Sequence, residues 1–296
     1  MAQPLPLWGH LGAVLQRCIA SERCAVLLDY DGTLTPLMTD PTAACLSPET
    51  RQVLAALLHH PRYQVAIVSG RALTDLQARV AGLTRYLAGN HGLEIAAPGM
   101  AYCHPEAVQL QPQVRALAEV LQYNLETIPG AWVEDKGLTL TVHVREVPAP
   151  YVPLVQRRVL RLLRPALEAR MLALRTGKAV VEVRPAVKWD KGEAVRWIVD
   201  HMRRGQPVTD VFPVYIGDDE TDEDAFRVLS AAGLGILVGS ERLSSAAHYC
   251  VESVEQTVQF LAVLSGLVWP MARGGARETP SWLDSAIPGE PLQSRP

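Results

Sequence analysis

Continuous apolar runs that end in polar residues recur along the chain. They occupy residues 24–28, 65–68 (within the predicted strand 63–68) and 211–217, and acidic or small polar residues follow each of them. Uninterrupted apolar runs of this length are typical of parallel strands that are buried on both faces. Segments with helical periodicity lie between them, such as 47–60, where Ser47 and Pro48 mark a helix start. Alternating strands and helices predict an α/β fold with a Rossmann-like, doubly wound parallel sheet.

The pattern changes in the middle of the chain. A helical segment at 108–128 is followed by strict alternation over 138–145, which predicts a strand with one polar, exposed face. We expect a further helix from Leu154 to about Leu174, kinked at Pro165, and then another strand at 178–185. These patterns predict two domains. The core is discontinuous and comprises residues 1–100 and 184–269, and an α+β cap domain of residues 101–183 is inserted into it. Residues 270–296 are rich in Pro, Gly and Ser and are predicted to form a disordered tail.

Composition narrows the functional classes. The 296 residues are 48% hydrophobic and 20% charged, with a formal net charge of −3, which is typical of a soluble globular protein. Nucleic-acid binding would require a basic surplus, and a membrane span would require a longer apolar run, so neither partner is expected. The five cysteines include no Cys-x-x-Cys pair, so we expect neither a disulfide framework nor a zinc site, and a reducing cytoplasm is the expected location.

Four short polar motifs stand at the ends of the predicted strands or at the start of a helix. They are Asp29-Tyr-Asp31-Gly32-Thr33, Ser69-Gly70-Arg71, Lys191-Gly192, and Gly217-Asp218-Asp219 with Asp222. Because ligands bind at the carboxyl ends of strands in doubly wound sheets, we expect these motifs to form one site. Clustered carboxylates repel one another unless a cation neutralises them, and Mg²⁺ prefers oxygen ligands.

The chemistry that suits this set is phosphoryl transfer. Asp29 is the candidate nucleophile, and Asp31 the candidate acid that protonates the leaving group. Ser69 and Lys191 are expected to hold phosphoryl oxygens. Asp29, Asp31 and Asp218 are the candidate Mg²⁺ ligands. Such a reaction depends mainly on positioning and on neutralising charge, and this set supplies both.

The same residues also admit simpler interpretations. Asp29 and Asp31 could form an ordinary strand-to-turn motif. A calcium-binding EF-hand loop is excluded, because Leu34 and Asp40 occupy the places of its Gly and Glu.

The acidic residues 218, 219 and 222 could simply serve the helix that follows them, and for Asp219 and Asp222 the question stays open. Lys188 competes with Lys191 for the phosphate. Lys191 is favoured because it precedes a glycine and a helix.

The four motifs, in this order, resemble the haloacid dehalogenase superfamily of aspartate-nucleophile phosphatases over residues 25–70 and 186–240. The segments "LDYDGTLTP", "SGR", "GNHGLEI", "EDKG", "HVR" and "GDDETDEDAF" are similar to the trehalose-6-phosphate phosphatases over about 25–265. The "HVR" segment departs from the family by placing Val144 where an aromatic residue is expected. The resemblance implies a Mg²⁺-dependent hydrolysis of trehalose 6-phosphate through an aspartyl-phosphate at Asp29, and a functional link to a trehalose-phosphate synthase.

The resemblance also implies substrate contacts on the core and the cap. For the cap, strand alternation supports them by placing polar side chains on common strand faces. The expected sugar-phosphate-binding residues are Arg71, His91, Glu134, Lys136, Arg145, Lys178 and Glu182. His91 belongs to the stretch 90–92, which we expect at the hinge beside the site. Trp132 and His143 share these faces, but Trp132 is interpreted as a packing residue and His143 as a residue that lies beside the substrate without contacting it. Two other functions remain open: hydrolysis of a different sugar phosphate such as sucrose 6-phosphate, and a catalytically silent sugar-phosphate-binding partner of a synthase.

Overall fold

The structure is a computed structural model that describes residues 3–177, 179–204, 210–239 and 244–267. The strands are β1 (Leu5–Pro6), β2 (Arg23–Leu28), β3 (Tyr63–Val68), β4 (Tyr86–Gly89), β5 (Glu94–Ala97), β6 (Met100–Cys103), β7 (Trp132–Asp135), β8 (Leu140–His143), β9 (Leu172–Gly177), β10 (Val180–Pro185), β11 (Val211–Gly217), β12 (Leu234–Val238) and β13 (Tyr249–Val251). The helices are α1 (Leu11–Ala20), α2 (Pro48–His59), α3 (Leu73–Val80), α4 (Pro105–Leu125), α5 (Val152–Glu168), α6 (Lys191–Arg203), α7 (Asp222–Leu229) and α8 (Val254–Ser265). Among the helices described, none is long and apolar enough to cross a membrane.

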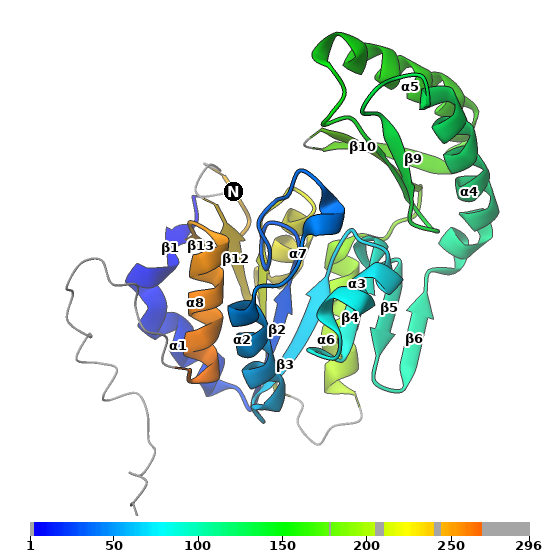
Figure 1. The fold of residues 1–296 in the computed structure, drawn as a ribbon. Helices are drawn as coiled ribbons and strands as arrows, with labels where there is room; N and C mark the ends of the chain where they lie inside the picture. The colour runs from blue at the N-terminus through cyan, green and yellow to red at the C-terminus, as the bar shows by residue number, and fades with distance from the viewer. Residues whose placement is uncertain (1–2, 178, 205–209, 240–243, 268–296) are drawn as a thin grey trace, which may run out of the picture.

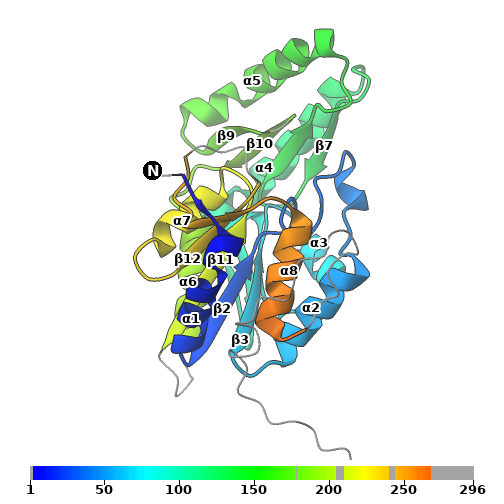
Figure 2. The ribbon, with the colours of Figure 1, turned by 90° about the vertical axis from the view of Figure 1, so that its left-hand side faces the viewer.

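The core is a nine-stranded sheet in the order β1-β13-β12-β11-β2-β3-β4-β5-β6. All neighbouring strands from β1 at one edge of the sheet through β13, β12, β11, β2 and β3 to β4 pair in parallel. The β5–β6 hairpin adds an antiparallel edge. Helices α1, α2, α3 and α8 pack on one face, and α6 and α7 on the other (Figures 1 and 2). The doubly wound α/β prediction is therefore confirmed.

Strand β2 shows why the apolar runs are continuous. Val26 and Leu28 belong to the cluster under α1, α2 and α8, whereas Ala25 and Leu27 belong to the cluster under α6 and α7. Both faces of the strand are thus buried, as parallel strands require. Strand β2 lies between β11 and β3, where the strand order reverses, so their carboxyl ends border the crevice in which ligands bind to such sheets.

The cap is a four-stranded antiparallel sheet in the order β7-β8-β10-β9, with α4 and α5 packed on one face. It lies over the edge of the core where β2 and β3 end (Figure 1). Strand β6 still pairs with β5, and β10 runs to Pro185 in the cap sheet. The expected boundaries at 100 and 184 fall inside these strands, and the chain passes between the two sheets near 104 and 186.

Two expectations about the cap were wrong. The helix expected to reach about Leu174 ends at Glu168, because Arg170 takes a left-handed conformation (φ 54°) and Leu172–Gly177 pairs with β10. The strand expected to be half exposed is buried on both faces: Thr141 and His143 are 3% and 8% exposed. The core covers the polar face, as the hydrogen bond from Thr139 Oγ1 to Asn90 Oδ1 (2.7 Å) shows. Lys178 and the tail at 270–296 lie outside the described residues.

Candidate active site

Three strand ends bring the predicted motifs together. Asp29 follows β2, Ser69 follows β3 and Asp218 follows β11. The Asp29 backbone N–H donates to Ile216 O at 2.9 Å, which ties the end of β2 to β11. Asp29 and Ser69 are buried, at 4% and 1% exposure. The expectation that these motifs share one edge of the sheet is met by this geometry.

Lys191 lies at the centre of the carboxylates. Its Nζ donates to Asp29 Oδ1 at 2.8 Å and to Asp222 Oδ1 at 2.7 Å, and lies 3.9 Å from Asp219 Oδ1. Burial lowers the pKa of Lys191, but the attraction of Asp222 and Asp29 outweighs it and raises the pKa well above its usual range. The competing Lys188 is exposed at the surface, so Lys191 is the lysine that the fold places in the site.

Asp222 organises the loop that carries Asp218. Its Oδ1 accepts from Lys191 Nζ and from the Tyr215 hydroxyl, each at 2.7 Å. Its Oδ2 accepts from the backbone N–H groups of Asp218 and Asp219, both at 2.9 Å. The carboxylate is fully buried. Sequence alone left the role of Asp222 open, and the four contacts show that it does more than begin α7.

Asp219 contacts the start of α7. Its Oδ1 accepts from Thr221 N at 2.8 Å and from Asp222 N at 3.1 Å. These bonds satisfy backbone donors that the first turn of a helix leaves without partners. These contacts of Asp219 therefore correspond to the simpler interpretation, in which the residue supports the start of the following helix.

Asp29, Asp218 and Asp222 can bring one carboxylate oxygen each within 4.8 Å of one another. Gly32 (φ 87°) allows this approach, since a Cβ there would lie 2.4 Å from the Asp218 carboxyl carbon. Hard oxygen donors at this spacing suit Mg²⁺. The oxygens of Asp222 already accept four hydrogen bonds, so Asp29 and Asp218 are the better placed carboxylate ligands.

Burial raises the pKa of Asp29 well above its usual range, and the neighbouring carboxylates act in the same direction. Lys191 opposes them, because its positive charge favours the ionised carboxylate. A divalent cation at this cluster would oppose them in the same way. The electrostatics therefore fit a site that holds a cation.

Asp31 lies apart from this carboxylate cluster. Its two oxygens accept from Arg71 Nε and Nη2, both at 2.7 Å. Arg71 also donates to Asp75 Oδ2 at 2.9 Å and to Pro41 O at 2.7 Å. The Asp31 side chain, expected among the metal ligands, is held by Arg71 in this structure, and its role as a ligand stays a prediction.

The cap contacts the core through residues expected to bind substrate. Glu182 Oε1 lies 2.8 Å from His91 Nε2 and 3.7 Å from Lys136 Nζ. Lys136 Nζ also donates to Gly70 O at 3.1 Å, beside Ser69. Arg184 hydrogen-bonds to both Glu182 and His91. Arg184 is not among the residues expected to bind the sugar phosphate, although strand alternation places it on the same face of β10 as Glu182.

Two pKa values in this group are strongly shifted. Burial lowers the pKa of His91 to about 4, with Glu182 opposing the shift. Burial raises the pKa of Glu182, but His91, Lys136 and Arg184 together lower it well below the usual range. Glu182 is therefore an ionised, buried carboxylate at the junction between cap and core.

Glu134 and Arg145 lie in a second part of the junction. Glu134 Oε2 is 2.9 Å from His143 Nε2, and the His143 ring stacks on Trp132 with centroids 3.8 Å apart. Arg145 Nη1 donates to Met38 O at 2.9 Å. With the loop at 38–41, Trp132, His143 and Arg145 line a cavity of about 280 Å³. Trp132 and His143, which the sequence analysis treated as packing residue and neighbour, thus face this cavity.

A doubly wound sheet, an Asp-x-Asp turn after its central strand, a buried lysine and an acidic loop after β11 define a haloacid dehalogenase-type phosphatase. The family described as trehalose-phosphatase matches residues 27–255. A probable trehalose-phosphate phosphatase E of Arabidopsis thaliana is 35% identical over 86% of this chain and 73% of its own length. Trehalose 6-phosphate phosphatase RA3 of Zea mays is 35% identical over 82% of this chain and 70% of its own.

Solved structures agree with the sequence comparisons. The C-terminal domain of Candida albicans trehalose-6-phosphate phosphatase superposes with a TM-score of 0.76 at 26% identity. The match covers 90% of this chain and 99% of that domain. The chain belongs to the trehalose-phosphatase family and is a phosphatase.

Proposed function

We propose that this phosphatase hydrolyses trehalose 6-phosphate to trehalose and phosphate, with Mg²⁺, through an aspartyl-phosphate at Asp29. The observation that carries the proposal is the buried Asp29–Lys191 pair beside Asp218, under the polar face of the cap. The family and the relatives named above support the substrate. The enzyme would act on the product of a trehalose-phosphate synthase.

Asp29 and Asp218 would hold the Mg²⁺ ion, which supplies positive charge for the phosphoryl oxygens. Lys191 fixes Asp29 by its bond to Oδ1, which leaves Oδ2 for the attack on phosphorus. As the Oδ2–phosphorus bond forms, the bond to the sugar oxygen breaks and Asp31 gives this oxygen a proton. Ser69 and Lys191 hold phosphoryl oxygens.

In the second step Asp31 takes a proton from water, which attacks the aspartyl-phosphate and releases phosphate and Asp29. Arg71 donates to both oxygens of Asp31, which fixes the orientation of this carboxylate. To carry a proton in the first step, Asp31 must separate from Arg71. The substrate phosphate, which is also negatively charged, offers Arg71 an alternative partner.

The polar face of the cap would bind the sugar. Glu134 and Glu182 accept hydrogen bonds from hydroxyl groups, and Lys136 and Arg145 donate to sugar or phosphate oxygens. Lys136 and Glu182 already contact the core at Gly70 and His91. The closed cap would exclude water from the reacting phosphate.

The test is phosphate release from a substrate panel, with Mg²⁺ and with EDTA. We expect the highest kcat/KM for trehalose 6-phosphate, lower values for sucrose 6-phosphate and glucose 6-phosphate, and no release with EDTA. A preference for sucrose 6-phosphate would change the assigned substrate. Binding of trehalose 6-phosphate without phosphate release would instead identify a silent sugar-phosphate-binding protein. Undiminished release with EDTA would refute the role of the metal.

A further inference from the structure

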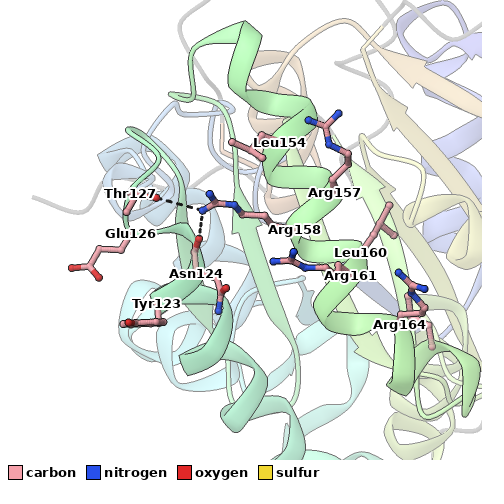
Figure 3. Close-up of a pocket in the computed structure, with 11 residues that line it drawn as sticks. Tyr123, Asn124, Glu126, Thr127, Leu154, Arg157, Arg158, Leu160, Arg161 and Arg164 are labelled. Atoms are coloured by element: carbon pink, nitrogen blue, oxygen red, sulfur yellow. Dashed lines mark hydrogen bonds between the residues drawn. The ribbon is translucent and has the colours of Figure 1, made fainter.

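The cap carries a second concave surface, on the side of its sheet away from the catalytic site. A groove of about 1060 Å³ lies between the end of α4 and the outer face of α5 (Figure 3). Both helices pack on the face of the cap sheet opposite the face that contacts the core. The groove therefore has no contact with the reacting phosphate, and the phosphatase reaction gives no reason for it.

The groove is strongly basic. Arg157, Arg161 and Arg164 stand at positions i, i+4 and i+7 of α5, so they form one stripe along the helix. All three are exposed. Among the residues that the structure describes, none of them forms an ion pair. With Arg158, four arginines and one acid, Glu126, line the groove, a local formal charge of 4 − 1 = +3 on a chain whose net charge is −3.

The remaining arginine shapes the groove. Arg158 Nη1 donates to Asn124 O at 2.5 Å and to Thr127 Oγ1 at 3.4 Å (Figure 3). Asn124 is in the last turn of α4, where carbonyl groups lack partners within the helix. Arg158 thus fixes α5 against the end of α4, and leaves the stripe of three arginines to meet a ligand.

Apolar side chains lie among these charges. Leu160, between Arg157 and Arg164 on α5, is 51% exposed, and Tyr123 on the opposite wall is 78% exposed. Leu154 and Leu167 also line the groove. A surface that combines exposed leucines with a basic stripe suits a ligand that has both apolar and acidic side chains.

We propose that this groove binds an acidic, amphipathic segment of a partner protein. Acidic side chains spaced at i, i+4 and i+7 on a partner helix would match the spacing of the arginine stripe. Nucleic-acid phosphates would leave the leucines unused, and a bilayer would meet a concave surface. The inference is independent of the substrate proposed above.

The test uses the full chain and a fluorescein-labelled, helix-forming peptide of about 15 residues, with Glu at i, i+4 and i+7 beside Leu residues. Fluorescence anisotropy should show saturable binding that weakens at high salt. The double variant Arg157→Glu/Arg161→Glu should bind the peptide at least about tenfold more weakly, because like charges then face each other. The matched control is Arg85→Glu/Arg115→Glu, which changes the net charge equally at exposed arginines outside the groove.

The control variant should keep the wild-type affinity within about twofold. Unchanged phosphate release by both variants would show that they are folded. Absence of peptide binding, or equal loss in both variants, would overturn the proposal. So would tighter, groove-dependent binding of an oligothymidine or of phosphatidylserine vesicles, because the occupant would then be a nucleic acid or a membrane.

Discussion

Replacing Asp222 by Asn tests whether this residue positions the site or binds the metal. The carboxylate accepts four hydrogen bonds, two on each oxygen. The amide of Asn has one oxygen and one NH₂ group. Whichever way it turns, the NH₂ group replaces an oxygen that accepts two hydrogen bonds, either from Lys191 and Tyr215 or from the backbone N–H groups of Asp218 and Asp219.

The cost follows from these contacts. At least two hydrogen bonds to a buried carboxylate are lost, each worth about 1.5–3 kcal/mol when one partner is charged. Lys191 also loses one of its two close anionic partners. We expect the free energy of unfolding to fall by about 3 kcal/mol. If the same energy is lost from the transition state, kcat falls about 100-fold, since each factor of ten corresponds to about 1.4 kcal/mol.

The assay combines urea unfolding with phosphate release at increasing Mg²⁺ concentration. A positioning residue predicts a low kcat that excess Mg²⁺ does not restore, because the loop at 218–219 is displaced. The matched control is Tyr215→Phe, which removes one neutral donor to Asp222 and should cost about 1 kcal/mol.

Two results would refute this reasoning. Recovery of wild-type kcat at high Mg²⁺ would identify Asp222 as a metal ligand. A variant with stability and kcat close to wild type would mean that the four contacts do not hold the loop.

Three further predictions address other residues of the site. Asp29→Asn should remove detectable turnover while circular dichroism and sugar-phosphate binding stay normal; near-normal turnover would end the aspartyl-phosphate mechanism. Glu182→Ala should lower kcat/KM for trehalose 6-phosphate about ten- to a hundredfold more than for p-nitrophenyl phosphate, which has no sugar hydroxyls; an equal loss on both would assign Glu182 to the fold. The pKa of His91 in the folded state, about 4, lies below its usual 6.5, so the folded state binds fewer protons and stability falls as the pH drops from 6.5 to 4. The difference of about 2.5 pH units corresponds to about 3 kcal/mol at most, and urea unfolding of His91→Gln should show a smaller loss over this range.

Local sequence was sufficient for the central strands of the core, whereas β1, β4, β13 and the β5–β6 hairpin were not predicted. Residues 24–28 of β2 and 65–68 of β3 are apolar on both sides of the sheet, so strand type and strand ends could be read without knowledge of neighbours. Asp29 and Ser69 were found because the turns that follow buried parallel strands lie at one edge of a sheet. The start of α2 followed equally from Ser47, whose hydroxyl accepts from Thr50 N at 3.1 Å.

The cap was harder to predict because its sheet contacts its own helices on one face and the core domain on the other. Alternation over 138–145 correctly separated the two faces of β8, but a polar face can be solvated or covered by another domain. Residues near Leu172 carry no local signal that distinguishes the end of α5 from the start of β9, since that strand depends on pairing with β10.

Sequence by itself determined which residue types stand at the strand ends, and so the class of chemistry. Tertiary structure alone decided how they pair: Asp31 with Arg71, 40 positions away, Lys191 with Asp29, 162 positions away, and Glu182 with His91, 91 positions away. The physical reason is that hydrophobic periodicity and turn chemistry act over a few residues. The partner of a buried charge depends instead on which distant segments the fold brings within hydrogen-bond distance.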